Sequence, residues 1–159
     1  MAQILDSLKS ILNASPPRIA FVRSGSLGDN ILLLPTMRLL QQENPNASVE
    51  IIGSAWARRI LPLTSHQWAF TPYDSAAMTQ LFTDQCLSLP PVLADADAII
   101  VYTASPDGPM INNIRALHPG PVLAHPLSPP PDRHVAAHLA AAITNQPPKL
   151  DNLPSPDLR

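Results

Sequence analysis

The chain has 159 residues, a net charge of −2 at pH 7 and only 10 lysines and arginines, which argues against nucleic acid or an anionic membrane as its main partner. Its length suits one domain, and its apolar share of 45% with 4% aromatic residues predicts a core of Leu, Ile, Val and Ala. The single cysteine, Cys86, excludes an internal disulfide and favours a reducing cytoplasm, and we expect a small buried residue rather than a reactive thiol. No apolar run reaches the roughly 18 residues that span a bilayer.

Apolar residues at helical spacing begin the chain. The spacing over residues 1–15 predicts a helical extension, which Pro16 and Pro17 end. This helix packs on the domain surface in one interpretation and lies on a membrane in the other. The second usually needs several flanking basic residues, and only Lys9 is available, so we favour the packed helix.

Strand and helix patterns then alternate along the chain. The predicted elements are, in order, a strand at 18–23, a helix at 29–43, a strand at 48–53, a helix at 55–63, a weaker strand at 68–73, a helix from a Ser75 cap to about Cys86, a strand at 96–103, a helix at 110–117, a strand at 121–126 and a helix at 132–143. We expect Asp29 and Asp132 to be N-caps, and Pro35 to kink its helix or make its first turn irregular.

This alternation predicts an α/β fold, a Rossmann-like parallel sheet with flanking helices. We expect it to occupy residues 1–145, with a Pro-rich linker or tail at 146–159. The chain contains 20 prolines, 14 of them from position 90 onward, so the second half should have short elements and many turns.

The loop RSGSLGDN, residues 23–30, separates the first strand from the following helix. It lacks the Gly-Lys-Ser/Thr of a nucleotide-binding P-loop and the third glycine of a dinucleotide fingerprint. Gly25 and Gly28 can adopt positive φ and let a substrate approach the backbone, while amides at the helix start can face an anion. Asp29 is either a helix cap or a carboxylate base facing the cleft.

A longer pattern surrounds this loop. Its parts are the strand at 18–23, the residues Ser26, Leu27, Gly28 and Asp29, a helix that carries Pro35 and Arg38, a turn at 45–47 and a strand at 49–52. This order resembles the N-terminus of glycosyltransferase family 9, the heptosyltransferases of lipopolysaccharide core synthesis. Residues 133–139 resemble the His-containing helix that closes the family's first domain, and the tail resembles its interdomain linker.

The resemblance implies the N-terminal half of a GT-B fold and an inverting sugar transfer that needs neither metal nor cofactor. The implied donor is a nucleotide-sugar such as ADP-heptose, and the implied acceptor is a lipopolysaccharide core precursor. Asp29 matches the family's general base, while Ser26, Leu27 and Gly28 would shape the loop near sugar and phosphate. The implied location is the cytoplasm, at the inner face of the inner membrane, with at most peripheral membrane contact.

The family's second domain, which binds the donor, has no counterpart in these 159 residues. We therefore expect this chain alone to lack useful transferase activity, and a separate donor-binding chain to be a candidate partner. Two alternatives remain: a Rossmann-like module that binds a nucleotide or another anion without turnover, and a structural or interaction protein that keeps only the fold.

Other residues carry weaker signals. Arg58 is a candidate contact for acceptor phosphates or part of a solvated helix face, and Thr103 is a candidate acceptor contact at a strand's carboxyl end. His134 and His138 have the i,i+4 spacing of a metal pair, but no Glu lies between them and no Cys lies nearby. We therefore expect no metal site.

Overall fold

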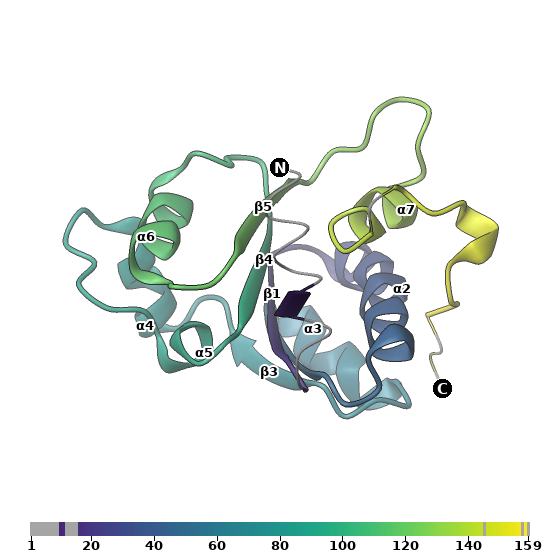
Figure 1. The fold of residues 1–159 in the computed structure, drawn as a ribbon, viewed down its shortest axis with the longest axis horizontal. Helices are drawn as coiled ribbons and strands as arrows, with labels where there is room; N and C mark the ends of the chain where they lie inside the picture. The colour runs from purple at the N-terminus through teal and green to yellow at the C-terminus, as the bar shows by residue number, and fades with distance from the viewer. Residues whose placement is uncertain (1–9, 12–15, 145, 157, 159) are drawn as a thin grey trace.

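The computed structural model describes residues 10–11, 16–144, 146–156 and 158 of the chain. The predicted helix at 1–15 lies outside these residues except for Ser10 and Ile11, which are helical. The described chain forms a parallel five-stranded sheet with helices on both faces, which confirms the Rossmann-like prediction (Figure 1). The strands are β1 (Arg18–Arg23), β2 (Ser48–Gly53), β3 (Ala69–Pro72), β4 (Ala98–Thr103) and β5 (Val122–Pro126).

The strands lie in the order β3-β2-β1-β4-β5. The chain moves outward from β1 to β3 and then returns to the other side of β1, so its direction reverses between β1 and β4. Val22 pairs with Val101 across these two strands, which brings their carboxyl ends side by side. In open α/β sheets this switch point is where ligands bind, and the loop after β1 starts there.

Two layers of helices cover the sheet, and they lie on opposite sides of it in Figure 1. One layer contains α2 (Leu27–Glu43), α3 (Ala55–Ile60), the 3₁₀ turn η1 (Leu61–Leu63) and α7 (Val135–Ala140). The other contains α4 (Ala76–Thr79), η2 (Gln80–Phe82), α5 (Pro91–Ala94) and α6 (Pro109–Leu117). A last 3₁₀ turn, η3 (Leu150–Asn152), belongs to the tail.

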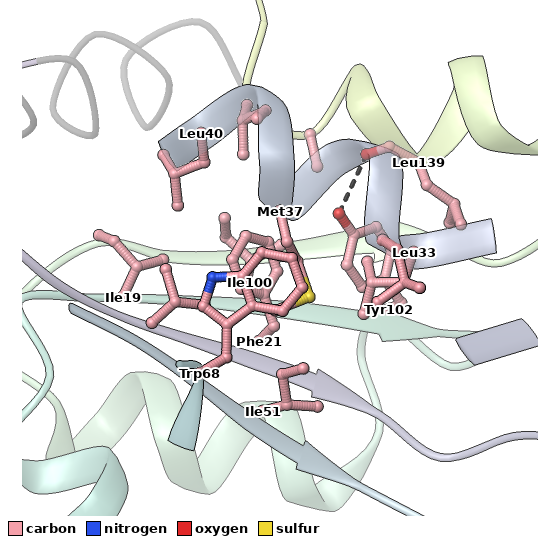
Figure 2. Packing of buried hydrophobic residues seen from close by; sticks show 14 of the residues in the cluster. Ile19, Phe21, Leu33, Met37, Leu40, Ile51, Trp68, Ile100, Tyr102 and Leu139 are labelled. Carbon is pink, nitrogen blue, oxygen red and sulfur yellow. Dashed lines mark hydrogen bonds between the residues drawn. The ribbon is translucent and has the colours of Figure 1, made fainter. Parts of the chain in front are cut away.

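The core follows from the two-residue alternation of the strands. On β1, Ile19 and Phe21 face the α2 layer, whereas Ala20 and Val22 face the α6 layer. Figure 2 shows Ile19 and Phe21 packed with Met37 of α2. Each large aliphatic side chain buried in this way contributes about 1.5–3 kcal/mol, so both faces of the sheet stabilise the fold.

Two helix caps differ from the predictions. α2 begins at Leu27 because Ser26, not Asp29, is its N-cap, and it runs through Pro35 as one helix. α7 covers only 135–140. It begins at Val135 because His134, not Asp132, is its N-cap, and the His134 Nδ1 accepts a hydrogen bond from a backbone amide of the first turn.

Several other elements are shorter than predicted. Ser75 does cap a helix, but the segment predicted to reach Cys86 ends at Phe82 as α4 and η2. Asn113 of α6 accounts for this end, because its side-chain amide donates to the carbonyls of Leu81 and Thr83. The helix predicted at 55–63 is α3 followed by η1, the strands predicted at 68–73 and 96–103 are β3 and β4, and α5 was not predicted.

The tail lies against the domain in the residues described. The guanidinium of Arg38 on α2 donates to the backbone oxygen of Ser155, and Leu158 forms an antiparallel bridge with Thr64. These contacts give this part of the tail defined partners, in contrast to the disordered end that its composition allows.

Candidate active site

The loop after β1 is closed by a capping box between Ser26 and Asp29. The backbone amide of Ser26 donates to Oδ2 of Asp29 at 2.8 Å, and the Ser26 hydroxyl donates to the same oxygen at 2.7 Å. The amide of Asp29 donates in return to the Ser26 hydroxyl at 3.4 Å. Asp29 is thus the third residue of α2, where a carboxylate also meets the positive end of the helix.

Arg23, the last residue of β1, holds the other side of the same carboxylate. Its Nη2 donates to Oδ1 of Asp29 at 3.1 Å, and its Nε donates to the Asp29 backbone oxygen at 3.1 Å. The Arg23 side chain is 3% exposed and that of Asp29 is 43% exposed. This role was not predicted from the sequence, although the alternation of β1 places residue 23 on the α2 side together with Phe21.

Buried polar contacts hold the loop backbone. The Ser54 hydroxyl, after β2, donates to the Gly25 carbonyl at 2.7 Å, and the Asn30 amide donates to the Ser26 carbonyl at 2.6 Å. Neither Gly25 nor Gly28 uses the positive φ that a glycine can adopt. Close approach explains Gly25 instead, because a Cβ there would lie 2.8 Å from Cβ of Asp29.

The surroundings lower the pKa of Asp29 below its ordinary value. The Ser26 hydroxyl is the largest cause and the Ser26 amide the next, with a further contribution from Arg23, and these outweigh the desolvation that acts in the opposite direction. The carboxylate is therefore ionised at neutral pH and able to accept a proton. As a weak base, it is suited to a hydroxyl that becomes acidic while it attacks an electrophile.

The structure gathers most of the predicted site residues at the switch point. Leu27 and Gly28 form the first turn of α2 and are exposed, adjacent to Ser26 and Asp29. Thr103 ends β4, the neighbour of β1, and its hydroxyl accepts a hydrogen bond from the Ser105 amide at 3.0 Å.

Arg58 lies apart from the Asp29 loop. It lines a groove of about 580 Å³ together with Thr64, His66, Trp68 and Phe70, beside the edge strand β3. None of the residues lining this groove belongs to the Asp29 loop. The structure therefore does not place Arg58 with the other predicted site residues.

His134 and His138 have separate roles. His134 caps α7, whereas His138 is buried and its Nε2 donates to the Pro126 carbonyl at 2.8 Å. Within the described ranges, no three His, Cys, Asp or Glu side chains are grouped to hold a metal ion. Within the same ranges, no helix combines the length and apolar character that crossing a bilayer requires.

This geometry defines a Rossmann-like domain with a carboxylate at its switch point. No protein family and no curated protein matches the chain by sequence. Three solved chains match by fold, and two of them are structures of one enzyme. One is E. coli heptosyltransferase WaaC with ADP, at 15% identity and a TM-score of 0.52, covering 81% of this chain and 46% of that one. The other is the same enzyme with ADP-2-deoxy-2-fluoro heptose, at 14% identity and a TM-score of 0.51, covering 87% and 55%.

The chain thus spans about half the length of the WaaC chains that it matches. At this level of identity, the likeness establishes a shared Rossmann-like fold.

Proposed function

We propose that the chain is the acceptor-side domain of a family 9 glycosyltransferase, which transfers a heptose-like sugar from a nucleotide-sugar to a lipopolysaccharide core acceptor. The observation that carries the proposal is the Asp29 carboxylate, ionised and half-exposed at the switch point of a heptosyltransferase-like fold. The Ser-Leu-Gly-Asp order of the loop supports it, because the sequence resembles that family in the same segment.

In the proposed reaction, Asp29 accepts the proton of an acceptor hydroxyl. The hydroxyl oxygen then attacks the anomeric carbon of the donor, and the nucleotide diphosphate leaves with inversion. Leu27, Gly28 and Thr103 would face the acceptor at this edge of the sheet. Neither a metal nor a cofactor takes part in this scheme.

A donor-binding domain completes the proposal. Bound ADP in the matched WaaC structure suggests an adenine nucleotide-sugar as donor, held by a second Rossmann-like domain. Residues 1–145 would form the acceptor-side domain and 146–159 the connection to the donor side or the surface that meets it. We place the reaction at the cytoplasmic face of the inner membrane, where such an acceptor is assembled.

The test combines the chain with a candidate donor-binding domain and measures sugar transfer from ADP-heptose. We expect transfer by the combination and none by the 159-residue chain alone. Asp29→Asn should lower kcat by about 100-fold or more, since the amide cannot take the proton. Asp84→Asn, an exposed carboxylate in the loop after η2, is the matched control and should keep full activity. Full activity of Asp29→Asn would remove Asp29 as the base.

Nucleotide binding by the chain without transfer in any combination would instead favour a binding module.

A further inference from the structure

We propose that Arg23 is the positioning residue of the Asp29 carboxylate, and that it leaves Oδ1 as the oxygen that meets the substrate proton. The positioning of Asp29 by Arg23 is inferred from contacts within the chain, whereas the role of Oδ1 in catalysis rests on the proposed function. Arg23 touches no reacting atom in this scheme; it acts through Asp29.

The Arg23 side chain is buried. A guanidinium that is 3% exposed is costly to keep charged unless it is paired, and Arg23 has one carboxylate partner among the described residues. Its guanidinium carbon also lies 5.7 Å from the ring centroid of Tyr102, a cation–π contact on the side of β4. The side chain is therefore enclosed between Asp29 and the end of the neighbouring strand, which leaves it little freedom to move.

Arg23 contacts Asp29 at two points. Nε holds the backbone oxygen of Asp29 while Nη2 holds its Oδ1, so one rigid planar group fixes the main chain and the side chain together. Ser26 holds Oδ2 from the opposite side. A lysine has a single nitrogen and cannot reproduce this fork.

The two oxygens of the Asp29 carboxylate accept hydrogen bonds from different residues. An ionised carboxylate has about four lone-pair sites, two on each oxygen. Among the described residues, Oδ2 of Asp29 accepts both the amide and the hydroxyl of Ser26, whereas Oδ1 accepts only from Arg23. The remaining site on Oδ1 is the one to which an incoming hydroxyl can donate. Oδ2 thus takes part in the helix cap with Ser26, whereas Arg23 orients Oδ1 for the proposed proton transfer.

The test uses the 159-residue chain with ¹³C-labelled aspartates and needs neither donor nor acceptor. NMR measures two properties of Asp29. The chemical shift of its carboxyl carbon reports the pKa of the carboxyl group, and three-bond couplings report the χ1 rotamer. Asp29→Asn identifies the Asp29 signal. We expect one rotamer in the wild type. In Arg23→Met we expect the pKa to rise and the couplings to average. In Arg23→Lys, which keeps the charge, the pKa should rise by less while the couplings still average.

Ser26→Ala is the contrasting variant. It removes the largest cause of the lowered pKa but leaves the Arg23 contact, so the pKa should rise while the single rotamer persists. Unchanged pKa and couplings in a folded Arg23→Met would overturn the proposal. If Arg23→Met does not fold, a single unchanged rotamer in Arg23→Lys overturns it. These readouts do not depend on transferase activity, so the positioning role and the proposed function fail separately.

Discussion

Acidification to pH 5 should destabilise the protein through His125, at the end of β5. The His125 Nε2 donates to the His138 carbonyl of α7 at 2.9 Å, and the two rings lie 4.5 Å apart. Burial is the main reason that the pKa of His125 is lowered from 6.5 to about 4, and the charges of His138 and Arg133 act in the same direction. Tyr102 meets the ring edge-on from β4.

The direction follows from proton linkage. Because the pKa of His125 is lower in the fold than in the unfolded chain, the unfolded chain binds more protons between these two values. The contribution of the neutral ring is complete above pH 6.5 and is lost as the pH falls toward about 4.

The lowering of the His125 pKa from 6.5 to about 4 corresponds to a contribution of about 3 kcal/mol to the free energy of unfolding. Water reaches part of this half-buried ring, so we expect about half of that value, and about 1 kcal/mol by pH 5.

The assay is urea unfolding at pH 7 and pH 5 for the wild type and for His125→Gln. Glutamine has no titration in this range and keeps an amide that can donate to the His138 carbonyl. The free energy of unfolding of the wild type should fall by about 1 kcal/mol more than that of the variant between the two pH values. Equal pH dependence of the two proteins would refute the reasoning.

Three further substitutions test the packing. Gly25→Ala should lower the free energy of unfolding by about 1–3 kcal/mol, since its Cβ would lie within 2.9 Å of the Asp29 carboxylate; a neutral result would exclude that close approach. Gly28→Ala is its control and should be neutral or stabilising, because Gly28 is helical and a Cβ there would meet Ser26 Oγ at an ordinary contact distance of 4.0 Å. Tyr102→Phe should cost about 1–2 kcal/mol, because it leaves the buried Leu139 carbonyl without the hydroxyl that donates to it at 3.0 Å (Figure 2). Urea unfolding measures all three, and an unchanged midpoint in Tyr102→Phe would show that another donor replaces the hydroxyl.

The sequence alone determined the fold class and the position of the loop. The segments at 18–23, 48–53 and 96–103 contain apolar runs at 19–22, 51–52 and 98–102, and such runs form strands buried on both faces of a parallel sheet. A loop after the first of these strands must lie at the carboxyl edge of the sheet. The spacing Ser26-x-x-Asp29 was also a readable signal of a capping box, and assigning Asp29 as the cap overlooked it.

The tertiary structure decided which side chains meet. Asn113 ends η2, and His125 contacts α7 near His138, because elements distant in the chain supply hydrogen bonds that local propensity does not contain. The pairing of Arg23 with Asp29 also depends on the tertiary structure. Strand alternation points Arg23 toward the α2 layer, but only the packed sheet and helix bury its charge and make Asp29 its partner. Local patterns specify the elements, whereas burial and contacts between distant elements specify how the carboxylate is held.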